Sequence, residues 1–201
     1  MTTSDRFSLR MSARDLVNIG IFAALYTVIT FAVTMLGIIN PPMMLVATGL
    51  SIIAGGVPFM LFLTRVDHAG MITVFAVVAG AVYTLMGTLP IAYLLMVVLA
   101  LVAEVVVWFG RYRSVIAGTV AYAVFSIWFF GPVMPLLYAR DDYLNHPGIQ
   151  SAGADYVAGV DALFSPTVVI AVAIGSAICG LIGGAFGARL LRRHFVRAGL
   201  A

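Results

Sequence analysis

Apolar residues occupy the chain in six long runs, which are separated by short breaks rich in glycine, proline or arginine. The runs cover about residues 16–39, 43–64, 69–88, 90–110, 114–138 and 165–189. A helix needs about 20 consecutive apolar residues to cross the hydrocarbon of a bilayer, and each run reaches this length. The pattern therefore predicts an all-α membrane protein in which a bundle of six transmembrane helices forms a single domain over residues 1–201.

One polar stretch stands between the fifth and sixth runs. It opens with the sequence YARDDYLNHP at Tyr138, and the connection as a whole covers residues 139–164. Loops of this length in compact proteins are often lids or binding loops. Because the other turns on the same side are short and uncharged, this is the only one large enough to fold over something. A lid and a solvated connector both agree with the pattern.

Composition supports the membrane interpretation. The chain is 63% hydrophobic and 9% charged, whereas soluble domains carry about 25% charged residues. The isoelectric point near 9.3 could suggest nucleic-acid binding, but the basic residues lie at the ends of the runs, where membrane topology explains them. The single cysteine, Cys179, lies in an apolar run, so neither a disulfide framework nor a cysteine-based metal site is expected.

The basic residues set the orientation, because positive charge is retained on the cytoplasmic side of membrane proteins. All eleven are arginines, and ten of them fall on one side of the predicted spans. These ten are Arg6, Arg10, Arg14, Arg65, Arg111, Arg113, Arg189, Arg192, Arg193 and Arg197. Only Arg140 lies on the other side, among the loop acids Asp141, Asp142, Asp155 and Asp161. Both chain ends are therefore predicted to be cytoplasmic, and the 139–164 loop to be outside.

Catalysis is not expected. The three histidines fall in predicted loops or tails, and neither G-x-S-x-G nor H-E-x-x-H occurs. Glu104 is the only charged residue within a span, and a nucleophile would need a base held beside it. No cofactor or resident metal site is predicted.

An energised transporter acting alone is also disfavoured. The chain has no G-x-x-x-x-G-K-[ST] motif with which to cradle ATP. Glu104 lies six residues before Gly110, within about 9 Å of the cytoplasmic end of its helix, which is the wrong depth for a midplane coupling site. The favoured interpretation makes Glu104 a partner for Arg111, Arg113 or a neighbouring subunit.

Small residues recur at intervals of four, the spacing that lets helices approach closely in a membrane. The last run carries two such rows: Gly175, Cys179, Gly183 and Gly187, and beside them Gly180, Gly184 and Ala188. The first run carries Gly20 and Ala24 near its cytoplasmic end. These faces are predicted to pack either within the chain or against another protein.

Polar and aromatic residues gather toward the outer ends of the predicted spans, namely Asn40, Tyr83, Thr84, Tyr93, Trp128 and Tyr138. Each one alone is typical of a residue facing lipid at the membrane interface. Their convergence with the long outer loop favours a pocket with apolar walls and a few polar groups. The loop would add Asp141, Asp142, Tyr143 and His146. Aromatic faces and carboxylates suit a flat or cationic small molecule.

Four stretches carry a resemblance to a known family: SARDLVNIGIFAALYTVITF, GGVPFMLFLTRVDHAGMITV, AYAVFSIWFFGPVMPLLY and GGAFGARLLRRHFVRAGL. In this order they resemble the substrate-binding S-components of energy-coupling-factor (ECF) ABC transporters, in particular the Trep_Strep group. The resemblance implies a multi-pass protein of the bacterial cell membrane, which captures a micronutrient at the outer face and topples in the membrane to release it.

The resemblance also implies partners. A transmembrane T-component and two cytoplasmic ABC ATPases would supply energy, so the missing ATP motif is expected. Family members dock the T-component through small residues of the first helix, and Gly20 and Ala24 fit that pattern. The fold that this resemblance implies does not identify the ligand, because one fold can bind many unrelated molecules. The metal-transporting versions have an N-terminal histidine that this chain lacks, which favours an organic cargo, vitamin-like, porphyrin-like or cationic.

Two other functions remain open on the sequence alone. The first is a stand-alone channel or facilitator for a small solute, oligomeric through the glycine rows of the last span. The second is a membrane assembly factor that binds no small ligand.

Overall fold

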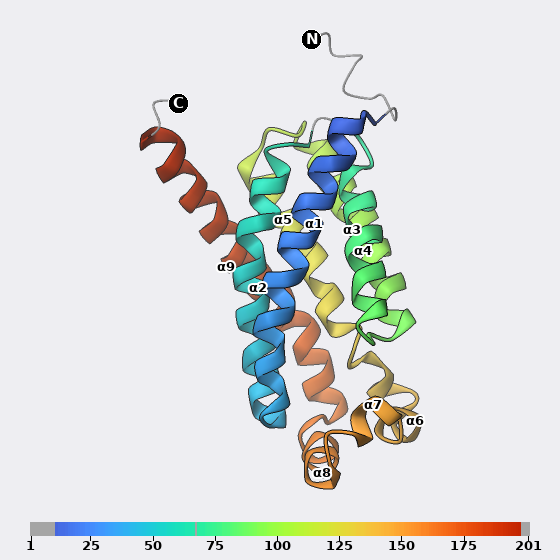
Figure 1. Cartoon of the computed structure of the whole chain (residues 1–201). Coiled ribbons are helices and arrows are strands. Elements are labelled where there is room, and N and C mark those ends of the chain that lie inside the picture. Colours follow the sequence, from blue (N-terminus) through green and yellow to red (C-terminus); the bar gives the residue numbers. More distant parts are fainter. Residues whose placement is uncertain (1–10, 67, 198–201) are drawn as a thin grey trace.

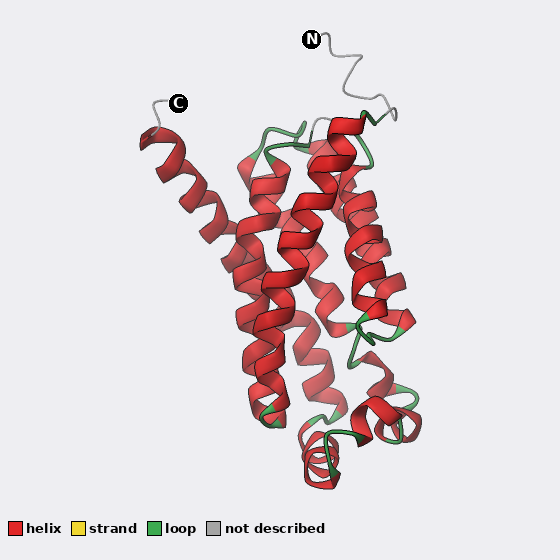
Figure 2. Ribbon diagram, in the orientation of Figure 1, coloured by secondary structure: helices red, strands yellow, loops and turns green. Residues whose placement is uncertain are grey.

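The structure is a computed structural model, and it describes residues 11–66 and 68–197. Within these residues the fold is all helical, without strands (Figure 2). The helices are α1 (Ala13–Thr34), α2 (Pro41–Leu63), α3 (Met71–Leu85), α4 (Pro90–Phe109), α5 (Val115–Ser126), α6 (Arg140–Leu144), α7 (Pro147–Gln150), α8 (Ala154–Leu163) and α9 (Pro166–Arg197). Short 3₁₀ helices are η2 (Met35–Ile38), η3 (Ile127–Phe130) and η4 (Met134–Leu137).

Four helices in the described part are long and apolar enough to cross a bilayer: Ala13–Ile38, Pro41–Leu63, Pro90–Phe109 and Pro166–Arg192. Two further apolar helices, Met71–Leu85 and Val115–Phe130, are shorter. Length and composition therefore support a multi-pass helical protein, and the count of six spans stays a prediction.

The fifth apolar run does not form one continuous helix over 114–138. Helix α5 ends at Ser126, and short 3₁₀ turns follow it. Pro132 and Pro135 lack the backbone N–H that a continuing helix would use. Gly131 permits a close crossing over α4, because a Cβ there would lie 2.8 Å from the Cα of Ala92.

The glycine rows of α9 pack inside the bundle. A Cβ on Gly56 of α2 would lie 2.3 Å from backbone atoms of Gly183, so the two helices meet backbone to backbone. On the neighbouring row, a Cβ on Gly180 would lie 2.7 Å from the Cα of Ala123 in α5. The spacing of these glycines allowed packing either within the chain or against another protein. For the rows of α9, the structure shows packing within the chain.

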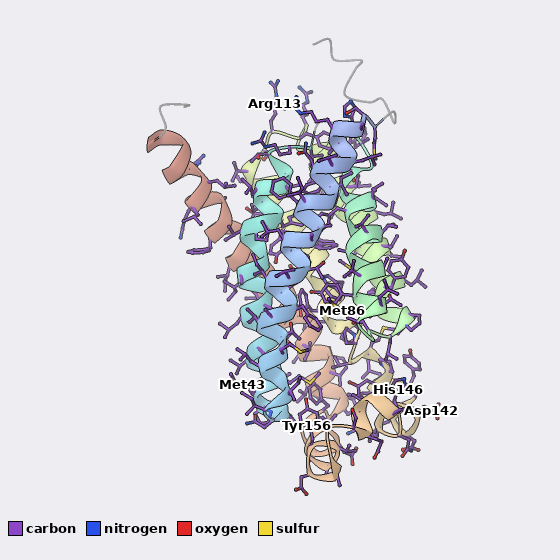
Figure 3. All side chains as sticks on the ribbon, in the orientation of Figure 1. Met43, Met86, Arg113, Asp142, His146 and Tyr156 are labelled. Atoms are coloured by element: carbon purple, nitrogen blue, oxygen red, sulfur yellow. The ribbon has the colours of Figure 1, made fainter. Side chains whose placement is uncertain are left out.

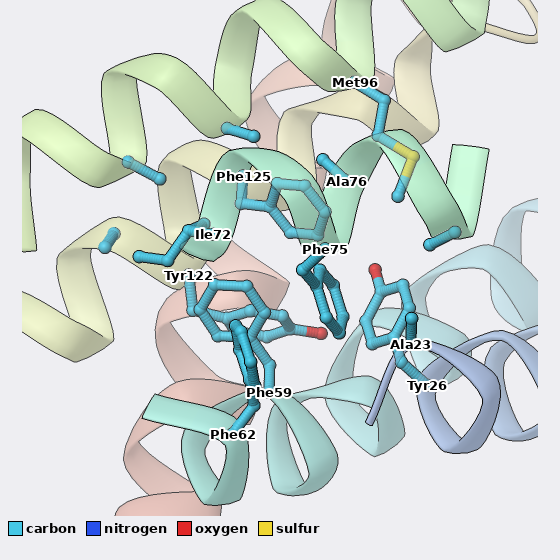
Figure 4. Close-up of a cluster of buried hydrophobic side chains, with 14 of the residues drawn as sticks. Ala23, Tyr26, Phe59, Phe62, Ile72, Phe75, Ala76, Met96, Tyr122 and Phe125 are labelled. Carbon is cyan, nitrogen blue, oxygen red and sulfur yellow. The ribbon is translucent and has the colours of Figure 1, made fainter. Parts of the chain in front are cut away.

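Aromatic side chains fill the centre of the bundle (Figure 4). Phe59 stacks on Phe125 with ring centroids 5.2 Å apart, and Tyr26 meets Phe75 edge to face at 5.5 Å. Tyr122 is fully buried among them and donates its hydroxyl to a backbone carbonyl of α2. This core ties α1, α2, α3 and α5 together.

In the part of the chain that the structure describes, Glu104 pairs with neither Arg111 nor Arg113, two of the partners that the sequence favoured. A partner in a neighbouring subunit stays a prediction. The Oε2 atom of Glu104 accepts the backbone N–H groups of Ile72 (2.9 Å) and Thr73 (3.3 Å), and its Oε1 accepts the hydroxyl of Tyr112 (3.1 Å). These N–H groups belong to the first turn of α3, whose own N-cap residue, Gly70, has no side chain to cap them. A carboxylate is favoured at this position because helix N-termini carry free donors and partial positive charge.

The two ends of the bundle differ in character. Helix α1 begins and α9 ends at the same end of the molecule, whereas α6, α7 and α8 lie at the opposite end (Figure 1). Arg113 lies at the first end and Asp142 at the second (Figure 3). The described arginines other than Arg140 belong to the first end, whereas Arg6 and Arg10 lie outside the described residues. Which end faces the cytoplasm stays a prediction.

Candidate functional site

A cavity of about 630 Å³ lies at the end of the bundle that carries the 139–164 loop. Its wall combines the last turn of α1, the end of α3, the start of α4, η3 and the loop helices α6 and α7. Small-molecule sites in proteins have volumes of about 300–1,000 Å³. The cavity is therefore large enough for an organic micronutrient.

Six of the ten residues predicted to bind substrate line this cavity: Tyr83, Trp128, Tyr138, Asp142, Tyr143 and His146. They come from α3, η3, the end of η4, α6 and the turn before α7. The fold thus brings together residues that are up to 63 positions apart in sequence. Their role in binding stays a prediction.

Two of the other predicted residues lie on the surface. Asn40 caps α2, because its side-chain oxygen accepts the backbone N–H of Met43 at 2.8 Å. Asp141 is exposed on α6 and is not part of the cavity wall, although its neighbour Asp142 is. Consecutive residues of a helix point about 100° apart, so only one of the two acids can face the cavity.

Thr84 and Tyr93 also lie outside the cavity wall. Thr84 follows Tyr83 on α3, and its hydroxyl donates to the carbonyl of Gly80 at 2.9 Å. The Tyr93 ring lies against the same glycine, where a Cβ would be 2.3 Å from it. Thr84 therefore bonds within its own helix, whereas Tyr93 serves the contact between α3 and α4.

Four aromatic rings form the inner part of the wall, which we call the aromatic floor: Phe31, Tyr83, Trp128 and Phe129. The centroids of Tyr83 and Trp128 are 4.8 Å apart, and those of Trp128 and Phe129 are 4.3 Å apart. Sequence reasoning missed Phe31 and Phe129. Both lie in continuous apolar runs and look like core residues in the sequence. The one signal that could have identified them is their position near the outer ends of those runs.

Hydrogen bonds beneath the aromatic floor fix its rings. Trp128 donates its indole N–H to the hydroxyl of Tyr26 at 3.1 Å, and the Tyr83 hydroxyl bonds to Thr30. Thr34, which also lines the cavity, donates to the Thr30 carbonyl at 2.7 Å. Tyr26 and Thr30 are fully buried. The polar atoms of Tyr83 and Trp128 are thus hydrogen-bonded to α1, and only their ring surfaces are left to face the cavity.

A small second core joins the 139–164 loop to η4 and α9. It is formed by Val133, Leu136, Tyr143, Val160, Phe164 and Val169. Burial, together with the nearby hydroxyl of Tyr156, raises the pKa of Tyr143 to about 12, so its phenol is neutral at physiological pH. Tyr156 of α8 reaches across to η2, where its hydroxyl donates to the carbonyl of Gly37 at 3.0 Å.

Arg140 holds the loop together. Its Nε donates to Oδ1 of Asp161 (2.7 Å), Nη1 to the carbonyl of Phe164 (2.7 Å) and Nη2 to the carbonyl of Asp161. The guanidinium thus joins the start of α6 to the end of α8. It lines a separate, shallow hollow rather than the cavity. The loop is therefore folded and contributes to the cavity wall, as a lid would.

The small residues of α1 lie on an open face. Gly20 and Ala24 are both exposed, and a Cβ on Gly20 would meet nothing within 4 Å. The side chains around them are apolar and exposed: Leu16, Val17, Ile21, Leu25 and Val28. Because Gly20 lies in the second turn of α1, this face begins at the end of the bundle opposite the cavity.

Among the side chains that the structure describes, no three His, Cys, Asp or Glu residues lie close enough together to hold one metal ion. The described cavity wall contains two such residues, Asp142 and His146.

Comparison with known proteins identifies a family. No curated protein and no solved structure matches the chain. A family described as hypothetical bacterial integral membrane protein (Trep_Strep) matches it over residues 13–197. This range takes in all nine described α-helices and both the cavity and the open face of α1. The resemblance to the Trep_Strep group is thereby confirmed, and the chain belongs to the Trep_Strep family of bacterial integral membrane proteins.

Proposed function

We propose that this protein is the substrate-capture subunit of an ECF-type importer in the bacterial cell membrane, with six spans and cytoplasmic chain ends. It binds a small micronutrient at the outer face and delivers it by docking to a T-component with two ABC ATPases. One observation carries the proposal: a lidded cavity of about 630 Å³ and an open small-residue face occupy opposite ends of one helical bundle.

The features of the cavity favour binding over catalysis. Its floor is made of ring surfaces whose polar atoms are already bonded, and its lid is a folded loop held by Arg140. Such a wall holds a ligand through apolar contact and offers little chemistry to transform it. We infer that the protein binds and releases its ligand unchanged.

The open face of α1 supports the proposed partner. A glycine and an alanine one helical turn apart let another helix approach closely, and Gly20 and Ala24 leave that approach free. The T-component and ATPases themselves are inferred from the family resemblance and from the absence of an ATP-cradling motif in the sequence.

The alternative, an oligomeric channel, lacks most of the contact surface that it needs between copies of the chain. It required the glycine rows of α9 to contact another copy, but Gly183 and Gly180 are already packed against α2 and α5. A second copy could reach Gly180 or Gly183 only by separating helices that are packed closely together, and among the glycines of these rows only Gly175 has open space around it.

Mass spectrometry of the purified protein tests the proposal directly. The protein is purified in mild detergent and denatured, and the released small molecules are identified. We expect one organic molecule at a stoichiometry near one, enriched over a Trp128→Ala variant. Flux of that molecule through the protein alone in liposomes, without ATP or partners, would instead support the channel. Absence of any bound molecule would remove the capture role.

A further inference from the structure

The charge of the cavity comes from one side chain. Among the described residues of the wall, Asp142 is the only acid, and no arginine is present. Arg140, the nearest basic residue in sequence, is held by Asp161 and the Phe164 carbonyl on another surface. A carboxylate that faces a binding site without a basic partner attracts cations and repels anions.

The other titratable groups of the wall are His146 and three tyrosines. The Nδ1 atom of His146 accepts the backbone N–H of Gly148 at 3.2 Å, so this nitrogen is engaged within the lid. The phenol of Tyr143 is buried and neutral, as described above. Asp142 is therefore the one carboxylate that the lid presents to the cavity. Asp142 and His146 lie beside each other on this lid (Figure 3).

The opposite part of the wall is apolar and flat-sided. Trp128 and Tyr83 are only 2% and 6% exposed, and their N–H and O–H groups point to Tyr26 and Thr30 rather than into the cavity. Ring faces without free donors favour the stacking of an aromatic body, and their negative quadrupole tolerates a positive charge. Such a floor offers nothing to a carboxylate.

From this arrangement we infer that the captured molecule is a planar aromatic cation, whose ring system stacks on the aromatic floor and whose positive group faces Asp142. Flat molecules that bear carboxylates, including porphyrins with acidic side chains, are disfavoured because the described wall has no arginine or lysine to pair with them. The inference rests on the proposed function, since it names the class of ligand that the capture site takes.

Tryptophan fluorescence can test this selectivity, because the chain has only two tryptophans. A Trp108→Phe background leaves Trp128 as the sole reporter, and Trp108 lies on the last turn of α4, away from the cavity. The protein is placed in nanodiscs of zwitterionic lipid. Three probes of similar size but different charge are titrated: N-methylquinolinium, 2-naphthamide and 2-naphthoate. We expect the cation to bind tightest and the anion weakest.

Two matched variants identify the source of the selectivity. Asp142→Asn is expected to weaken binding of N-methylquinolinium by about two- to five-fold, the range for an exposed ion pair, and to leave 2-naphthamide unchanged. Asp142→Lys should place the anion ahead of the cation. The control is Asp141→Asn, which removes a carboxylate from the same helix but outside the wall, and it should change no affinity.

The outcomes separate this inference from the proposed function. Equal or tighter binding of 2-naphthoate by the parent protein, or equal effects of Asp141→Asn and Asp142→Asn, would overturn the inference. So would failure of all three probes when mass spectrometry nevertheless finds a bound molecule, and in that case the capture role stands. If no probe binds and no molecule is found, both proposals fail.

Discussion

At the scale of single residues, Glu104 shows what periodicity cannot reveal. The sequence marks it as the only charge within a span, but its partners, the first N–H groups of α3, lie about 30 positions away. A helix N-terminus has no side-chain signature of its own when glycine is its N-cap. The sequence could therefore indicate that Glu104 needed a partner, but Arg111 and Arg113, which it favoured, are not the groups that the carboxylate contacts.

Glu104 also leads to a prediction about Tyr112, in the turn between α4 and α5. Burial and the charge of Glu104 both raise the pKa of the Tyr112 phenol above its ordinary value. In Glu104→Gln the charge is lost while burial remains, so this pKa should fall part of the way back. Carbon-13 NMR of ring-labelled tyrosine measures it, with Tyr112→Phe to assign the signal. An unchanged pKa would show that the carboxylate does not interact with the phenol.

At the scale of elements, the lid depends on the clamp that Arg140 forms between α6 and α8. Arg140→Gln keeps a hydrogen-bonding side chain but loses the charge and most of the donors that reach Asp161 and Phe164. We expect faster proteolysis within 139–164 and a ligand dissociation rate raised about three- to ten-fold, which corresponds to roughly 1 kcal/mol. The comparison is Arg113→Gln at the opposite end of the bundle. Equal cleavage of both variants would show that the clamp does not hold the lid.

The open face of α1 predicts a separation of binding from transport. Gly20→Leu adds a bulky side chain where a partner helix would approach, but nothing in the chain lies within 4 Å of the new Cβ. Uptake in cells that carry the T-component and ATPases should therefore fall by at least ten-fold, while ligand affinity of the purified protein stays unchanged.

A matched substitution controls for this change. Gly175 of α9 is also helical and also has open space around its Cβ, but it lies on another helix. Gly175→Leu should leave both uptake and affinity near the wild-type values. If Gly20→Leu supports normal uptake, the docking role of α1 is wrong, whatever the affinity.

The elements themselves were partly predictable. Apolar runs located α1, α2, α4 and α9 well, because their length and composition alone select a spanning helix. The same rule misplaced the end of α5, since Pro132 and Pro135 lie in a run that is apolar throughout. In the candidate site, polar and aromatic residues at span ends were recognisable only in part, since Asn40, Thr84 and Tyr93 fit the same rule but lie outside the cavity wall. The helical phase that separates Asp142 from Asp141 was not recognisable, because no apolar period runs through the loop.

At the scale of the whole molecule, the open question is which end of the bundle faces outward. The described arginines other than Arg140 lie at the end opposite the lid, and positive charge is retained in the cytoplasm. The lid and the cavity should therefore be accessible from outside the cell. A reversed orientation would place the cavity where it could not capture an external nutrient.

Single-cysteine labelling in intact cells tests this orientation. Cys179→Ala first removes the only native cysteine. A cysteine is then placed at one of two exposed sites, Ser151→Cys in the lid or Arg113→Cys in the turn before α5. A membrane-impermeant maleimide should label the first variant in intact cells and the second only after lysis. Labelling of Arg113→Cys in intact cells would show that the orientation in the membrane is the reverse of the predicted one. The aromatic floor would then face the cytoplasm, and the capture of an external ligand would have to be abandoned.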